Sequence, residues 1–249
     1  MTETPVKNTY SRLDFNAPMS PERARSLVER VAAVAPATVT DYGCGWGELL
    51  LRVLEAAPAT TGTGVDTDAG LLERGREEAR KRGLADRAAF VAAPADTVTG
   101  PADLAVCVGA SHAWGGTGQA LRFLRDRVPA GGTVLLGEAF WGRRPSAGEL
   151  AAMWPDASAD DHPDLGGLVD LAIGAGLRPV AVDPVTDAEW DAFESAYLAD
   201  FEYRALALGD GPEADRLRER ADAHRNAWLR GYRGILSFAY LTLVAVDPA

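Results

Sequence analysis

Apolar residues near the start of the chain recur at helical spacing, and further on the pattern alternates between strand and helix periods. Ser20 is a good helix N-cap, Pro21 suits the first helical position, and the helical pattern ends at Pro36. The later pattern predicts strands at residues 38–42, 61–65, 88–93, 103–108 and 133–140, with helices at 48–57, 68–82 and around 120–128. Parallel strands joined by helices form a sheet that is covered on both faces, so the pattern predicts an α/β fold.

The last third of the chain departs from this alternation. A helix at 165–175 and a short strand at 179–183 precede two long helical stretches, which are separated by a turn at 209–212. The apolar stripe of the first stretch consists of Trp190, Phe193, Tyr197 and Phe201, and that of the second of Ala214, Leu217, Ala221, His224 and Trp228. An apolar run at 235–246 predicts a long buried final strand, so the two helices form an insertion ahead of it.

Composition narrows the class of protein. The 249 residues are 47% hydrophobic and 24% charged, as in ordinary globular chains. Cys44 and Cys107 are too few for a disulfide framework and suit a reducing compartment. No signal peptide or membrane-spanning run is visible, and a net charge of −11 disfavours a nucleic-acid partner. We therefore expect a cytoplasmic protein that acts on a small molecule and has no membrane partner; the oligomeric state is open.

The most informative segment follows the first predicted strand, where residues 41–47 read DYGCGWG. Glycines are needed where the backbone turns tightly and approaches a ligand closely, and the helix that follows offers free N–H groups. Asp66 ends the next strand, where a carboxylate can accept hydrogen bonds from ribose hydroxyls. The segment therefore predicts a nucleoside site.

The spacing of the glycines discriminates between cofactors. A dinucleotide fingerprint is G-x-G-x-x-G with a pyrophosphate at the helix start, whereas this chain has G-x-G-x-G followed by Glu48. A carboxylate at that helix end disfavours a pyrophosphate and tolerates a ligand with positive charge. The pattern favours a cationic nucleoside over a nicotinamide dinucleotide.

From residue 38 to 140 and in the final strand, the chain resembles the class I S-adenosylmethionine-dependent methyltransferases that act on small molecules. Residues 41–47 resemble the family's glycine motif, Gly64-Val65-Asp66 the acidic motif, and Ala95-Asp96 the adenine-contacting pair. Residues 103–108 and 129–133 resemble the motifs around the fourth and fifth strands. The resemblance implies a Rossmann-like α/β sheet of seven mostly parallel strands, with helices on both faces and an antiparallel last strand. The large helical insertion before that strand, which we expect to act as a lid, departs from the family's usual pattern.

The resemblance also implies a domain organisation and a cofactor site. Residues 36–184 and 233–249 would form the domain that binds S-adenosylmethionine, with lids from residues 1–35 and 185–232. Gly43, Gly45 and Gly47 would admit the methionine part, Asp66 would hold the ribose and Asp96 the adenine. We expect cofactor contacts from Tyr10, Asp41, Gly43, Cys44, Gly45, Trp46, Gly47, Asp66, Thr67, Ala95, Asp96, Val108, Gly109 and Ser111.

Methyl transfer from a sulfonium is an in-line displacement that depends chiefly on positioning. His112 follows the fourth strand and is a candidate general base, or a loop histidine that contacts the cofactor. Glu138 is a candidate for orienting the acceptor, or a structural ion-pair partner. The histidines and cysteines do not have metal-ligand spacing, so no metal is expected.

Aromatic residues are the candidates for the acceptor pocket: Phe15, Trp114, Phe140, Trp141, Tyr197 and Tyr203. The aromatic residues of the inserted helices have a simpler reading as packing between helices and sheet. An aromatic pocket suits acyl-chain or quinone-like acceptors, and no Asn/Asp-Pro-Pro-Tyr element follows the fourth strand, which argues against methylation of nucleic-acid bases.

The expected activity is transfer of a methyl group to an O, N or C atom of a small molecule. Three alternatives stay open: a rearrangement catalyst that uses the cofactor's charge, a binder that uses the cofactor as a sensor or scaffold, and a nicotinamide oxidoreductase.

Overall fold

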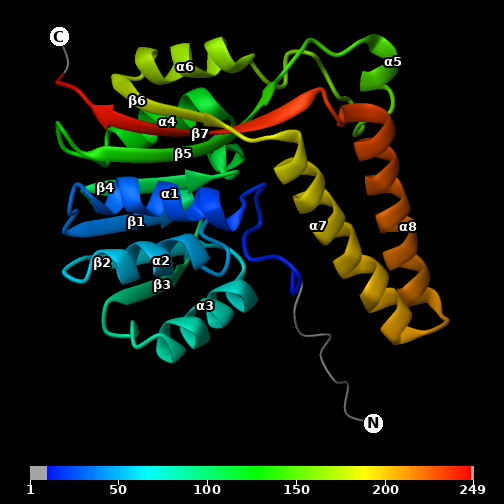
Figure 1. Cartoon of the computed structure of the whole chain (residues 1–249), viewed down its shortest axis with the longest axis horizontal. Helices are drawn as coiled ribbons and strands as arrows, with labels where there is room; N and C mark the ends of the chain where they lie inside the picture. Colours follow the sequence, from blue (N-terminus) through cyan, green and yellow to red (C-terminus); the bar gives the residue numbers. More distant parts are fainter. Residues whose placement is uncertain (1–9, 248–249) are drawn as a thin grey trace.

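The computed structural model describes residues 10–247. A single seven-stranded sheet forms its centre, with the strand order β3-β2-β1-β4-β5-β7-β6 (Figure 1). The strands are β1 (Thr38–Tyr42), β2 (Thr61–Asp66), β3 (Ala88–Ala92), β4 (Leu104–Val108), β5 (Thr133–Trp141), β6 (Leu177–Pro184) and β7 (Leu236–Ala245). β7 is antiparallel to both β5 and β6, and the other pairings are parallel. The predicted seven-stranded, mostly parallel sheet with an antiparallel last strand is confirmed.

Helices cover both faces of the sheet. The longer helices are α1 (Pro21–Ala32), α2 (Glu48–Ala56), α3 (Ala69–Lys81), α4 (Thr117–Arg125), α6 (Leu165–Gly174), α7 (Asp187–Leu208) and α8 (Pro212–Asn226). The short ones are η1 (Ala95–Thr97), η2 (Ser111–Trp114), α5 (Ala147–Leu150) and the π-helical η3 (Ala227–Tyr232). Apolar side chains of α1, α2 and α3 form one core with the sheet, and those of α4 and α6 form a second core. None of the helices within residues 10–247 is long and apolar enough to span a membrane.

The helix starts follow the capping signals of the sequence. The Ser20 hydroxyl accepts a hydrogen bond from the Arg23 N–H at 3.2 Å, and Pro21 is the first residue of α1. The Asp68 carboxylate accepts hydrogen bonds from the N–H groups of Gly70 and Leu71 at the start of α3. These caps determine the residues at which α1 and α3 begin.

The predicted helical insertion is present as the antiparallel pair α7 and α8, which extends beyond the edge of the sheet (Figure 1). α7 is longer than the predicted stripe, and α8 continues into the π-helical turn η3, which the sequence did not predict. Because a π-helical turn contains more residues than an α-helical turn, residue 232 lies on the same face as residue 224. In an ideal α-helix these two residues would be about 80° apart around the helix axis. Tyr232 therefore reaches His224, with its hydroxyl 3.2 Å from Nε2.

Candidate functional site

The turn between β1 and α2 has the shape that its glycines predict. Gly43, Gly45 and Gly47 have φ values of +73°, +56° and +70°, in the left-handed region that side chains rarely adopt. A Cβ on Gly43 would lie 2.3 Å from the Ala110 Cβ, whereas a Cβ on Gly45 would have no atom within 4 Å. Gly43 is thus required by packing against the loop after β4, and Gly45 by backbone conformation beside open space.

Asp66 organises this turn as well as facing it. One carboxylate oxygen accepts a hydrogen bond from the Gly45 N–H at 2.8 Å, and the other accepts one from the Asp68 N–H at 2.9 Å. Each carboxylate oxygen has two lone pairs, so Asp66 retains capacity for further donors. The second strand and the glycine turn are therefore joined at the point where a ribose is expected.

Asp41 is the second carboxylate of this edge and is 4% exposed. Burial, and to a lesser degree the negative charge of Asp66, raises the pKa of Asp41 to about 7. Burial also raises the pKa of the Cys44 thiol, which therefore stays protonated. The site holds a carboxyl group whose charge depends on what binds beside it.

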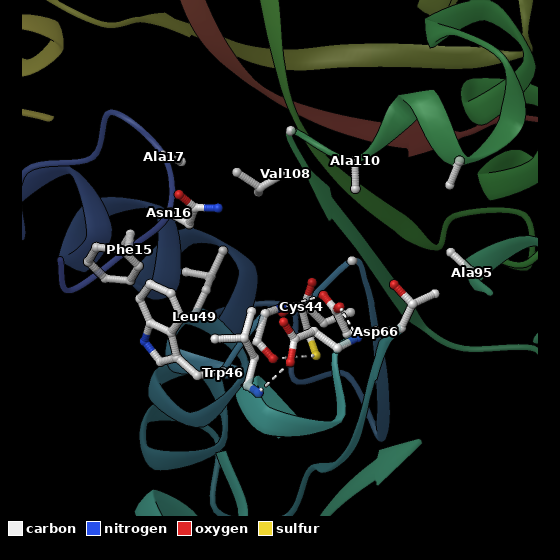
Figure 2. A pocket seen from close by; sticks show the side chains of 18 of the residues that line it. Phe15, Asn16, Ala17, Cys44, Trp46, Leu49, Asp66, Ala95, Val108 and Ala110 are labelled. Carbon is white, nitrogen blue, oxygen red and sulfur yellow. Dashed lines mark hydrogen bonds between the residues drawn. The ribbon is translucent and has the colours of Figure 1, made fainter. Parts of the chain in front are cut away.

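A cavity of about 490 Å³ opens between the glycine turn, the ends of β2 and β4, and the N-terminal strap, which we define as residues 10–19. The predicted residues that line it are Tyr10, Phe15, Asp41, Gly43, Cys44, Gly45, Trp46, Asp66, Thr67, Ala95, Asp96, Val108, Gly109 and His112. In Figure 2, Asn16, Ala17, Val108 and Ala110 lie across the cavity from Cys44 and Asp66. The structure thus brings most of the expected cofactor residues to one cavity.

The side chains that line this cavity carry an excess of negative charge. Its lining includes Asp14, Asp41, Glu48, Asp66, Asp68 and Asp96, and no lysine or arginine among the described residues. Glu48 is compensated from behind, because it forms ion pairs with Arg52 and Arg82 at 2.7 and 2.5 Å. Such a lining repels phosphates and favours a neutral or cationic ligand with hydroxyl and amino donors.

The strap covers the glycine turn from outside. The Trp46 indole Nε1–H donates to the Asp14 carbonyl at 3.1 Å, and the Tyr10 ring stacks on Trp46 with centroids 6.1 Å apart. Arg74, on α3, lies with its guanidinium 4.0 Å from the Trp46 ring centroid and donates to the Tyr10 carbonyl. Phe15 and Leu13 are buried, so the strap is attached through its middle.

Three of the predicted contacts near this turn lie outside the cavity lining. Gly47 faces the core, since a Cβ there would lie 2.6 Å from the Phe90 ring. Ser111 is buried at the first position of η2. Trp114 packs on Tyr42 and Phe123 in the second core.

The other predicted acceptor residues also lie outside this lining. Phe140 and Trp141 are buried in the two cores, and Trp141 stacks on Trp154 with centroids 6.3 Å apart. Tyr197 stacks on Tyr10 at 5.8 Å, which places it behind the strap. Tyr203 is 54% exposed and contacts Arg12, whose guanidinium lies 3.7 Å from its ring centroid.

Glu138 and the other histidines are also away from the cavity. Glu138 lies within β5 and is 6% exposed, and its Oε1 accepts the hydrogen bond of the next backbone N–H at 3.0 Å. His162 packs edge-on against Trp141, and burial lowers its pKa. His112 is exposed and lines the cavity, so it is the histidine that the structure places at this site.

Two carboxylates on α7, which the sequence pattern did not predict, are buried. Glu194 is 3% exposed and accepts hydrogen bonds from the Tyr232 hydroxyl at 2.7 Å and pairs with His224 Nε2 at 2.6 Å. Asp200 is 2% exposed and faces the strap. Both lie three or four residues from members of the predicted aromatic stripe, and this helical spacing is the sequence feature that indicates their burial.

The described residues contain no group of three or more His, Cys, Asp or Glu side chains placed to hold a metal ion.

Comparison with known proteins places this geometry in a family. Residues 40–134, which contain the glycine turn and Asp66, match a family model described as a methyltransferase domain. The uncharacterized protein YjhP of Escherichia coli K12 is 30% identical over 178 residues, which are 70% of this chain and 71% of YjhP.

Solved structures share the fold over nearly the whole chain. A methyltransferase from Geobacter sulfurreducens, crystallised with S-adenosyl-L-homocysteine, has a TM-score of 0.84 at 24% identity and covers 93% of both chains. The E. coli YjhP crystal structure also has a TM-score of 0.84 at 24% identity, and covers 93% of this chain and 95% of its own. The [4+2]-cyclase SpnF has a TM-score of 0.69 at 20% identity, and covers 92% of this chain and 83% of its own.

The family model thus spans the glycine turn and Asp66, and the solved structures share the overall fold of the chain. This chain is a relative of YjhP and belongs to the class I S-adenosylmethionine-dependent methyltransferase family.

Proposed function

We propose that this protein binds S-adenosylmethionine in the 490 Å³ cavity and transfers its methyl group to a small molecule. The observation that carries the proposal is the cavity itself, which combines a glycine turn and two strand-end carboxylates with an acidic lining. A cationic nucleoside supplies the hydroxyl, amino and ammonium donors that such a lining binds. When bound, it supplies a methyl group activated by a positively charged sulfur.

The chain's own residues have distinct roles in this proposal. Asp66 accepts hydrogen bonds from the ribose hydroxyls and Asp96 from the adenine amino group. Gly45 leaves open space for the methionine part, and the Asp41 carboxylate offsets positive charge there. The strap closes the cavity through the contact of its Tyr10 with Trp46 of the glycine turn, and so limits the entry of water.

His112 is proposed as the residue that accepts a proton from the acceptor, because it is exposed at the cavity and follows β4. Glu138 does not line the cavity, so the proposal assigns it no contact with the acceptor. An amine that is already neutral needs no base, so the role of His112 depends on an acceptor that carries an acidic proton.

The experiment incubates the protein with S-adenosylmethionine carrying a labelled methyl group and a panel of phenols, quinols, amines and fatty acyl compounds. The expected result is labelled methyl product together with S-adenosylhomocysteine. On the accepted compound, His112→Ala should lower turnover by about 10²–10⁴-fold while leaving cofactor binding unchanged. Cofactor binding without any labelled product, across the panel, would contradict methyl transfer.

A second candidate function is supported by the similarity to SpnF, a protein described as a cyclase. In that case the bound cofactor contributes its charge, and the acceptor rearranges without gaining a methyl group. The same incubation separates the two, because a rearranged product has the mass of its substrate.

A further inference from the structure

The Asp200 carboxylate on α7 faces the first residues of the strap. Its Oδ1 accepts hydrogen bonds from the Ser11 N–H at 3.1 Å and the Ser11 hydroxyl at 3.0 Å, and its Oδ2 accepts one from the Tyr10 N–H at 3.3 Å. Residues 10 and 200 are distant in sequence, so these bonds connect the helical pair to the part of the chain that covers the cofactor cavity.

Asp200 is buried, and the strap supplies hydrogen bonds to it. The side chain is 2% exposed, and the cation within ion-pair distance among the described residues is Arg204, at 3.6 Å. A buried carboxylate is costly unless hydrogen bonds replace its water, and here three of the donors come from residues 10 and 11. The strap-closed arrangement therefore contains the compensation that keeps this charge buried.

Tyr10 also contacts residues on the opposite side from α7, next to the cofactor cavity. Tyr10 has φ +66°, a conformation rare for side-chain-bearing residues, and its carbonyl accepts a hydrogen bond from Arg74 at 3.3 Å. Its ring lies between Trp46 of the glycine turn and Tyr197 of α7, with centroids 6.1 and 5.8 Å away.

A second contact of α7 lies next along the strap, where Arg12 packs on the Tyr203 ring. The start of the strap is thus in contact with α7 at three successive positions, 10, 11 and 12. Movement of α7 away from the sheet edge would break all of these contacts together.

We propose that Asp200 is a positioning residue that holds Tyr10 and Ser11 over the cofactor cavity, so that bound cofactor leaves when α7 releases the strap. This inference rests on the proposed cofactor site. It makes the helical pair α7–α8 the element that controls cofactor residence, and links any acceptor that contacts α7 to cofactor release.

The test measures dissociation of S-adenosylhomocysteine from the full chain by stopped-flow tryptophan fluorescence. Asp200→Asn retains one acceptor oxygen but loses the charge, and we expect dissociation about tenfold faster than in the wild type. Ser11→Ala removes the hydroxyl bond and leaves the carboxylate charged, so we expect a smaller acceleration of about two- to fivefold.

The matched control is Glu189→Gln on the same helix. The Glu189 carboxylate accepts hydrogen bonds from the Arg23 guanidinium at 2.7 Å and the Ser20 N–H at 3.4 Å, and neither of these two residues lines the cavity. We expect this variant to melt at a lower temperature and to release S-adenosylhomocysteine at the wild-type rate.

Wild-type rates in both Asp200→Asn and Ser11→Ala would overturn the proposal, as would equal acceleration in Glu189→Gln, which would indicate general loosening of α7. Ser11 is exposed, so its variant decides the matter even if Asp200→Asn does not fold. A wild-type protein that does not bind S-adenosylhomocysteine would instead contradict the proposed function, and this inference with it.

Discussion

At the scale of single residues, the glycines of the turn differ in why they are needed. A Cβ on Gly43 or Gly47 collides with Ala110 or Phe90, whereas Gly45 has free space beside it. All three have positive φ, so their backbone cost of substitution is similar. Gly43 and Gly45 both line the cavity, but only Gly45 has open space beside its α-carbon, so a side chain there meets a ligand before it meets the protein.

Gly45→Ala therefore should weaken S-adenosylhomocysteine binding by at least about tenfold, because its methyl group occupies ligand space, and should cost about 1 kcal/mol of folding free energy. Gly83→Ala is the matched control: Gly83 also has positive φ, at +69°, and nothing within 4 Å of the added Cβ, but it follows the C-terminal end of α3 and does not line the cavity. Calorimetry and urea unfolding of the two variants check this. Equal affinity in both would place Gly45 outside the binding surface.

The raised pKa of Asp41 predicts a pH-dependent affinity. Because that pKa is about 7 in the free protein, the carboxyl is partly protonated at neutral pH. A bound ammonium group favours the ionised form and lowers the pKa, so binding should release a proton from Asp41 near pH 7. Affinity for S-adenosylhomocysteine should therefore fall as the pH is lowered from 8 to 6.

Calorimetry in buffers of different ionisation enthalpy measures this proton release directly. In Asp41→Asn the release and the associated pH dependence should disappear. A variant that keeps the wild-type pH profile would show that another group titrates with binding.

At the scale of elements, the pair α7–α8 is held together by a buried polar cluster as well as by aromatic packing. Glu194 of α7 is the common partner of His224 and Tyr232. Burial, the charge of Glu194 and the hydrogen bond to it all raise the pKa of the Tyr232 hydroxyl, so that hydroxyl stays a donor. The cluster depends on the π-helical turn that returns Tyr232 to the His224 face.

Glu194→Ala should lower the free energy of unfolding by about 1–3 kcal/mol, because the buried Tyr232 hydroxyl loses its acceptor. Asp215→Ala on α8 removes an exposed carboxylate that pairs with Arg218, and should change stability by less than about 0.5 kcal/mol. Urea unfolding of the two variants compares them. Equal stability losses would mean that the buried cluster contributes no more than a surface ion pair.

The sequence predicted the sheet and its helices well because periodicity, caps and glycines are local signals. Ser20, Asp68 and the glycine turn each determine structure within a few residues. The π-helical turn and the contact of Asp200 with residues 10 and 11 were not predictable in this way, since they depend on side chains brought together by the fold.

The aromatic acceptor residues show the same limit. Trp114, Phe140 and Trp141 pack in the cores, because large aromatic side chains bury well between the sheet and its helices. Tyr197 and Tyr203 contact the strap instead of the cavity, because α7 lies against residues 10–12. Their predicted contact with an acceptor stays a prediction.

At the scale of the whole molecule, the fold concentrates negative charge in one cavity, while the lysines and arginines of residues 10–247 lie outside its lining. The net charge is −11, and the cavity lining repeats that imbalance at the carboxyl ends of β1 and β2. The strap and α7 close over this edge of the sheet from the outside (Figure 1). An acidic, covered, nucleoside-sized cavity is the property from which the proposed chemistry follows.

The most direct test is calorimetric titration of the wild-type chain, Asp66→Asn and Asp103→Asn with S-adenosylhomocysteine, and of the wild type with NADH. Asp103 accepts a hydrogen bond from the Thr38 N–H at the start of β1, far from the cavity, so its variant is the control. We predict single-site binding to the wild type and Asp103→Asn, at least about tenfold weaker binding to Asp66→Asn, and none of NADH. Absence of S-adenosylhomocysteine binding to the wild type, or an affinity of Asp66→Asn equal to that of the wild type, would contradict the proposed cofactor site.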